Sequence, residues 1–301
     1  MSDQKSIKLL VGDNPFHGIS HLSQERSRTR GEEMGNVEYL ASLVETSLSN
    51  GADGFMFSVS EVTLSILREL RNRKAELGFE AYAIVPYAYD YVRMATQKGG
   101  VLGLGKKVAK DIVFSGNVRA AALGIKGIVL TDIAAILKTY VLYEVSRIKS
   151  SAGKNVRLNS ILLHEIVTEM VLALDMDWLV RAYIDFMRKL NMSPGFETRN
   201  FPYLVNKFKE WNIAFKGLTI ATAFNKVGFQ MNPSKEECEK ALVDAEGANV
   251  IGMSILAAGY LKPLEAIDYL KFLRNLNGVV IGVSKEHHAR ETFRLVRERL
   301  C

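Results

Sequence analysis

The chain has 301 residues, of which 48% are hydrophobic and 24% are charged, the proportions of an ordinary globular protein. Its net charge of +6 is spread through the predicted helices, and the densest basic stretch, residues 26–30, is interrupted by Ser and Thr, so nucleic-acid binding is not predicted. The two cysteines make no disulfide framework, no apolar run approaches the ~20 residues that span a bilayer, and no signal peptide opens the chain, so we expect a cytoplasmic protein.

Short apolar runs alternate with helical patterns along most of the chain. Eight of the runs are predicted strands, at residues 8–12, 54–59, 81–85, 156–163, 195–200, 218–224, 249–256 and 278–282. Helical spacing of apolar residues predicts helices at residues 37–48, 61–77, 166–190, 201–211, 234–245, 264–276 and 286–299. Residues 87–155 break the alternation, and their helical patterns, notably at 131–148, predict a long, mainly helical insertion between strands three and four.

This order of elements predicts one (β/α)8 barrel domain, a TIM barrel that spans residues 1–301. A doubly wound open sheet is the alternative, but residues 12–18 after the first strand lack the Gly-x-Gly-x-x-Gly turn that binds dinucleotides in such sheets. Residues 128–130 are interpreted as part of the helical insertion, because counting them as a strand would give nine strands.

The carboxyl ends of barrel strands carry the chemistry in this fold, and five residues there are catalytic candidates. Asp13 and His17 follow the first strand, Tyr87 follows the third, His164 the fourth and Lys226 the sixth. A histidine at this rim serves as a general acid or base, a tyrosine donates a proton, and a desolvated lysine forms a Schiff base with a carbonyl group. Charges at the opposite strand ends are expected to be ordinary loop charges; these are Lys8, Asp53, Glu80 and Lys216.

A metal site is a weaker hypothesis for the same rim. His17 and His164, together with Asp13 and either Glu61 or Glu165, would supply two imidazoles and two carboxylates. No local spacing of the His-x-x-x-His kind supports this set, so a resident metal is not expected.

The last strand, a glycine turn and the last helix follow one another directly, which is how a backbone forms an anion site at a helix N-terminus. Ser284 stands where the N-cap of that helix is expected. The sequence therefore predicts a phosphate site, and its residues are Gly259, Gly282, Val283, Ser284, Lys285 and Arg290.

Four segments of the second half occur in a characteristic order, namely residues 160–164 (SILLH), 195–213 with Asn200 before a helix, 253–261 (MSILAAGYL) and 280–285 (VIGVSK) with Arg290 beyond. In this order they resemble the aldo-keto reductase superfamily of (β/α)8 barrels. The resemblance implies a catalytic role for His164, a bound NADP or NAD, and cofactor contacts from Asn200 and from the predicted phosphate site. The first half departs from the family pattern, since its strand-two aspartate, its tyrosine and its strand-three lysine have no counterparts here. Tyr87 is the predicted replacement for the proton donor.

Three functions remain open on the sequence. The first is reduction of a small, anionic carbonyl compound by a nicotinamide nucleotide with His164 and Tyr87. The second is a lyase or aldolase in which Lys226 forms a Schiff base with a phosphorylated substrate. The third is a ligand-binding barrel without catalysis.

Overall fold

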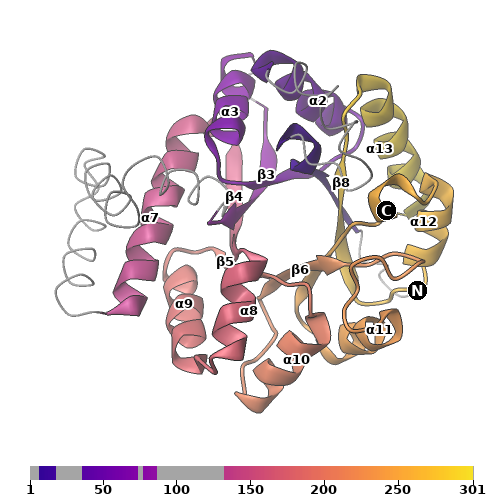
Figure 1. The fold of residues 1–301 in the computed structure, drawn as a ribbon. Helices are drawn as coiled ribbons and strands as arrows, with labels where there is room; N and C mark the ends of the chain where they lie inside the picture. Colours follow the sequence, from indigo (N-terminus) through magenta and orange to yellow (C-terminus); the bar gives the residue numbers. More distant parts are fainter. Residues whose placement is uncertain (1–6, 18–35, 74–76, 87–131, 301) are drawn as a thin grey trace, which may run out of the picture.

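Eight parallel strands form a closed barrel, which Figure 1 shows in a view along the barrel with the helices outside the ring. The computed structural model describes residues 7–17, 36–73, 77–86 and 132–300. Each strand pairs with its neighbours in chain order, and β8 pairs with β1 to close the ring. The predicted (β/α)8 barrel is therefore confirmed. The strands are β1 (Lys8–Gly12), β2 (Gly54–Ser58), β3 (Phe79–Val85), β4 (Val156–Leu163), β5 (Ser193–Glu197), β6 (Thr219–Ala223), β7 (Asn249–Met253) and β8 (Leu276–Gly282).

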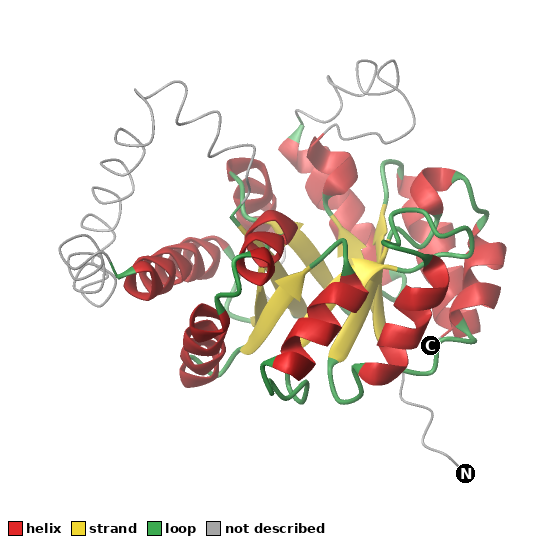
Figure 2. Ribbon diagram, turned by 60° about the horizontal axis from the view of Figure 1, so that its bottom comes forward, coloured by secondary structure: helices red, strands yellow, loops and turns green. Residues whose placement is uncertain are grey.

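The α-helices of the described residues surround the strands, as the side view in Figure 2 shows. They are α2 (Val37–Ser49), α3 (Glu61–Arg73), α7 (Ile133–Ser151), α8 (Glu165–Ala173), α9 (Asp177–Lys189), α10 (Phe201–Glu210), α11 (Lys235–Asp244), α12 (Pro263–Leu270) and α13 (Glu286–Leu300). Within the described parts of the chain, no helix combines the length and the apolar character that crossing a membrane requires.

Alternation along the strands gives the barrel two apolar layers. Leu10, Met56 and Leu162 point into the barrel and form a small inner cluster. Their neighbours along the strands, such as Leu9 and Phe55, belong to the larger cluster between the sheet and the helices. Because successive side chains of a strand face opposite sides, this pattern fixes which residue of each strand reaches the mouth of the barrel.

Helix α7 lies inside the predicted insertion, but it belongs to the regular outer layer. It packs between α3 and α9 and so serves as the barrel helix between β3 and β4. The rest of the predicted insertion, residues 87–131, lies outside the described residues, and residues 128–130 lie there too.

Several predicted boundaries are wrong, and two of these differences matter most. The single helix predicted at 166–190 is two helices, α8 and α9, because Asp175 has a φ of 55°, which a right-handed helix does not contain. The strand predicted at 195–200 is β5, which begins and ends earlier. This second shift changes which side chains stand at the mouth of the barrel.

The amino-terminal end of the barrel contains a network of polar side chains rather than ordinary loop charges. Lys8 pairs with Glu80, and the same carboxylate oxygen accepts hydrogen bonds from Tyr82 at 2.8 Å and from Asn159 at 3.0 Å. Burial alone would raise the pKa of Glu80, but the bonds from Lys8 and Tyr82 lower it overall. These contacts join β1, β3 and β4 and make this end a structural base.

Candidate active site

Asp13 and His17 form a buried pair at the mouth of the barrel, where β1 ends. His17 lies in the short 3-10 helix η1 (Asn14–His17), which brings its Nε2 to 3.0 Å from Oδ2 of Asp13, and the two side chains are only 6% and 5% exposed. The same oxygen of Asp13 accepts the backbone N–H of Ser58 at 2.7 Å. Asp13 therefore fixes the imidazole and joins the ends of β1 and β2.

His164 follows β4 directly and is the N-cap residue of α8. Its Nδ1 accepts the backbone N–H of Ile166 at 3.2 Å. Burial lowers the pKa of His164, Arg199 lowers it further, and Glu165 opposes them. A neutral imidazole that accepts at Nδ1 carries its proton on Nε2, so His164 has an N–H group to donate.

Glu197, the last residue of β5, is the site residue that sequence reasoning missed. Its side chain is buried, and burial, joined by the charge of Glu165, raises the pKa of Glu197 to about 8. Asp13 also raises this pKa, so the two carboxyl groups lie close enough to interact across the mouth. Glu197 is therefore protonated at neutral pH.

The sequence did contain a signal for Glu197. Phe196 belongs to the cluster between the sheet and the helices, so the next residue must face the barrel interior. Predicting the strand at 195–200 placed its rim at residues 198–200 and so assigned Glu197 to the middle of the strand.

Arg199 and two glutamates of α8 organise the loop after β5. The Nε of Arg199 forms an ion pair with Glu165. One oxygen of Glu169 accepts hydrogen bonds from Thr198 Oγ1 at 2.6 Å and from the backbone N–H of Arg199 at 3.0 Å. The backbone N–H of Glu165 donates to Glu197 at 3.3 Å. The start of α8 thus fixes both ends of the segment from Glu197 to Arg199.

The structure also gives the surroundings of two other predicted residues, Lys226 and Asn200. Lys226 is exposed, so the desolvation that a Schiff-base lysine needs is missing at this position. Asn200 is the N-cap of α10, and its side-chain oxygen accepts the backbone N–H of Tyr203 at 3.2 Å. Its predicted contact with a cofactor stays a prediction.

The predicted phosphate site lies where β8 ends and α13 begins. A side chain at Gly282 would meet the ring of Pro15 at 2.8 Å, so this position is glycine because Pro15 packs over it. Helix α13 begins at Glu286 and the carbonyl of Lys285 accepts its first backbone bond, so Lys285, rather than Ser284, is the N-cap residue. The carbonyl of Ser284 accepts the hydroxyl of Tyr39 at 3.1 Å.

The other members of the predicted phosphate site differ in position. Val283 is buried. Gly259 ends the 3-10 helix η3 (Ala257–Gly259) with a φ of 91°, a value that favours glycine. Arg290 is exposed and pairs with Glu286 at 3.1 Å one turn along α13. Phosphate binding at these residues stays a prediction.

Tyr87 lies outside the described residues.

Of the metal candidates, Glu61 is exposed on α3 and pairs with Arg147 at 2.6 Å. The described residues contain no group of three or more His, Cys, Asp or Glu side chains arranged to hold a metal ion.

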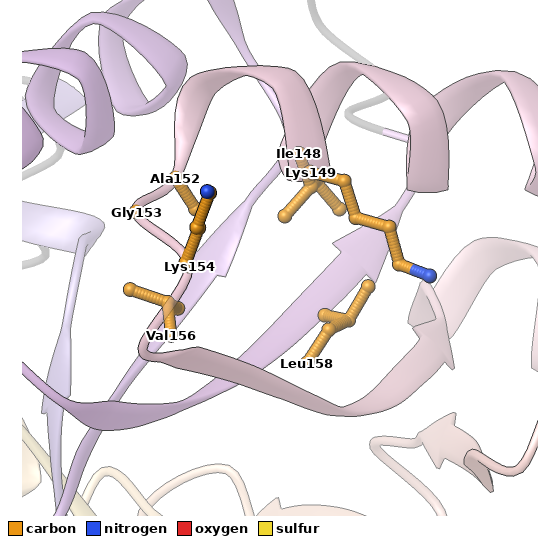
Figure 3. Close-up of a pocket in the computed structure, with 7 residues that line it drawn as sticks. All are labelled: Ile148, Lys149, Ala152, Gly153, Lys154, Val156 and Leu158. Atoms are coloured by element: carbon orange, nitrogen blue, oxygen red, sulfur yellow. The ribbon is translucent and has the colours of Figure 1, made fainter.

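A surface pocket of about 260 Å³ lies at the other end of β4, where α7 ends (Figure 3). Its floor is apolar, with Ile148, Val156 and Leu158, and Lys149 and Lys154 flank it. Because β4 enters the barrel here and leaves it at His164, this pocket is separate from the mouth.

Comparisons with known proteins identify a fold. No family model matches the sequence, and no curated protein matches it. Two solved structures from Pseudomonas aeruginosa, each provisionally assigned as an aldo-keto reductase and one of them named PA4992, cover 97% of this chain. They have TM-scores of 0.55 and 0.56, identities of 9% and 10%, and matches over 91% and 90% of their own chains. The chain is therefore similar in fold to these two structures over nearly its whole length, and that fold is a closed (β/α)8 barrel.

Proposed function

We propose that the protein is an aldo-keto-reductase-like oxidoreductase that reduces a small carbonyl compound with NADP(H) or NAD(H). The observation that carries this proposal is the buried, protonated carboxyl of Glu197 at the mouth of a barrel of this fold. Carbonyl reduction needs a proton donor beside the carbonyl oxygen, and a carboxyl with a pKa of about 8 is protonated at neutral pH. Glu197 thereby takes the part that the resemblance assigns to a tyrosine and a lysine, for which the chain has no counterparts.

The residues of the mouth divide the work of proton transfer. A nicotinamide nucleotide, when bound, would supply the hydride for the carbonyl carbon. Glu197 gives its proton to the carbonyl oxygen, which becomes a hydroxyl, and the carboxylate left behind is reprotonated from water. The Nε2–H of His164 donates a hydrogen bond to the same oxygen and stabilises its developing negative charge. The pair of Asp13 and His17 closes the opposite wall.

The loop between β8 and α13 has groups that suit the nucleotide's phosphates. In the described chain the backbone N–H groups of Val283, Ser284 and Lys285 have no acceptor, and they precede the positive end of the α13 dipole. The ammonium group of Lys285 is exposed beside them. These residues support a phosphate contact, and Gly259 permits close approach from the β7 side.

Binding and turnover test this function separately. Titration of the protein with NADPH and NADH, followed by nucleotide fluorescence, is expected to give saturable binding. Lys285→Glu should weaken that binding about tenfold or more, because a charge-assisted contact is replaced by repulsion. Oxidation of the bound nucleotide by a panel of small aldehydes, ketones and oxo acids then tests the chemistry. Absence of binding by either nucleotide at millimolar concentration would contradict the proposal.

The lyase alternative has no support in the structure, because Lys226 is exposed. Borohydride trapping is its direct test, since a Schiff base on Lys226 would become a stable secondary amine. No trapped adduct is expected.

A further inference from the structure

Arg199 stands at the mouth of the barrel with its backbone held in place. Glu169 accepts the backbone N–H groups of Arg199 and Asn200 at 3.0 and 3.2 Å. The same oxygen accepts the hydroxyl of Thr198, so one carboxylate of α8 fixes three consecutive residues of the loop. Because this backbone is already ordered, a ligand that binds the side chain of Arg199 does not have to order the loop.

Most of the hydrogen-bonding capacity of Arg199 is unused. Its guanidinium group has five N–H donors, and in the part of the chain that the structure describes only the Nε–H has an acceptor, which is Glu165. The side chain is 37% exposed, whereas that of Glu165 is 22% exposed. The outer edge of the guanidinium, with its two Nη groups, has the planar fork that matches a carboxylate.

The neighbours of Arg199 are the proposed reacting groups. Its charge lowers the pKa of both His164 and Glu197, so it lies within electrostatic reach of both. Glu197, the last residue of β5, precedes Arg199 by only two residues in the chain. In one small ligand, the group that binds Arg199 would therefore be only a few bonds away from the carbonyl oxygen that Glu197 protonates.

We propose that Arg199 binds the carboxylate of the substrate, so that, on the function proposed above, the substrate is a short oxo acid. A planar carboxylate takes the two Nη groups while Glu165 keeps the Nε–H, and the carbonyl of the same molecule faces Glu197 and His164. Two anions share one guanidinium in this arrangement, which its five donors permit.

The charges of the mouth favour a carboxylate over a phosphate at this place. Among the described residues, Glu165 and Glu169 bind the loop of Arg199, and Asp13 acts electrostatically on the neighbouring Glu197. A phosphate brings up to two further charges where a carboxylate brings one.

Binding of oxamate, an unreactive monoanionic analogue of a 2-oxo acid, tests this proposal without any nucleotide. Isothermal titration calorimetry of the full chain should show binding of oxamate and much weaker binding of pyruvamide, which has no carboxylate. Arg199→Gln should weaken oxamate binding about ten- to a hundredfold, the range for a lost charge-assisted pair. Arg68→Gln is the matched control, since Arg68 is also an exposed arginine paired with a glutamate, but on the outer surface of α3, and it should bind oxamate as the wild type does.

A second variant gives an effect of the opposite sign. Glu165→Gln removes the competing anion, so it should tighten oxamate binding about two- to fivefold. Equal binding of oxamate by the wild type and Arg199→Gln, or no binding by the wild type, would overturn the proposal. If Arg199→Gln does not fold, as judged by circular dichroism, Glu165→Gln decides, and weaker or unchanged binding counts against it. Stronger binding of inorganic phosphate than of oxamate, lost in Arg199→Gln, would replace the carboxylate by a phosphate.

The two proposals can fail independently. Oxamate binding that depends on Arg199 in a protein that binds no nucleotide would leave the anion site standing and remove the oxidoreductase. Reduction of neutral aldehydes at the same rate by the wild type and Arg199→Gln, without oxamate binding, would do the reverse.

Discussion

Each end of the barrel has a glutamate on a strand, and the pKa values of these two glutamates shift in opposite directions. At the amino-terminal end, Glu80 accepts bonds from Lys8, Tyr82 and Asn159, and although burial raises its pKa, the bonds from Lys8 and Tyr82 lower it overall. At the carboxyl-terminal end, Glu197 has acidic neighbours, and burial with the charge of Glu165 raises its pKa to about 8. The same side chain is thus ionised and paired at one end and neutral at the other.

On the proposed function, this difference separates the residues that stabilise the barrel from those that react. A carboxylate with cationic and hydroxyl partners is satisfied, and it holds strands together. A carboxyl group kept neutral among other acids costs stability whenever it must ionise, but it retains a proton that it can give away. Substitutions at Glu80 and Glu197 test this contrast between the two pKa values.

The largest effect is expected from Glu197→Gln on turnover. Glutamine keeps the shape of the protonated side chain and still accepts the backbone N–H of Glu165, but it has no proton to transfer. Reduction of the best carbonyl substrate should slow by about 10²- to 10⁴-fold, the usual contribution of a general acid. Steady-state assays of nucleotide oxidation measure this, with unchanged NADPH binding as the control. Full activity in the variant would remove Glu197 from the reaction.

The same variant should remove the pH dependence that Glu197 gives to the free energy of unfolding. The unfolded chain loses this proton near the ordinary value of 4.5, whereas the folded chain keeps it up to about 8, so wild-type stability from this group falls as pH rises through that window. Glu197→Gln has no such loss. At the upper end of the pH window, its free energy of unfolding should therefore exceed that of the wild type by on the order of a few kcal/mol. Urea unfolding of both proteins across the window measures the difference. Parallel curves would mean that Glu197 ionises normally.

Glu80→Gln should have a smaller effect, of the opposite sign and at the other end of the barrel. The loss of charge from the pair with Lys8 is expected to cost about 1–3 kcal/mol at neutral pH, in the lower part of that range because Lys8 is 38% exposed. The lowered pKa means that the wild-type advantage is present above pH 4.5 and disappears as pH falls through the folded value. Turnover should stay unchanged in folded protein, and a large loss of turnover would connect the two ends functionally.

The smallest effect is expected for Lys226→Met. The side chain is exposed, so the free energy of unfolding should stay within about 0.5 kcal/mol and carbonyl reduction within about twofold. Unfolding curves and nucleotide-oxidation assays are the measurements. Complete loss of turnover would instead revive the Schiff-base chemistry.

The fold was predictable because its signals are repeated. Alternation of short apolar runs with helical patterns over the whole chain indicates a (β/α)8 barrel even when single boundaries are wrong, as at Asp175. The rim also follows from the order of elements, so the sequence alone locates Asp13, His17 and His164 at the strand ends where they lie. These inferences need only the strand ends, to within a residue or two.

The rest depends on register and on contacts between distant residues, which the sequence does not contain. β5 ends three residues earlier than predicted, which hid Glu197, and the raised pKa of Glu197 comes from burial and from the proximity of Glu165 and Asp13 in three dimensions. Lys8 and Glu80 were predicted to be loop charges, because nothing in the sequence shows that they meet across 72 positions. The role of Gly282 changed for the same reason, since only the structure shows Pro15 above it.

His164 is the N-cap of α8 and, in the proposed function, a hydrogen-bond donor to the substrate, so a substitution there has two effects at once. Its ring both faces the site and caps α8, and that helix carries Glu165 and Glu169, which hold the loop with Glu197 and Arg199. Replacement by alanine would therefore remove a cap typically worth ~1 kcal/mol and loosen two partners of the site at once. Asparagine caps helices well and has no imidazole, so it separates the lost ring from the frayed helix. On the proposed function, a loss of activity measured for a variant of His164 would therefore combine the lost ring with the lost helix cap.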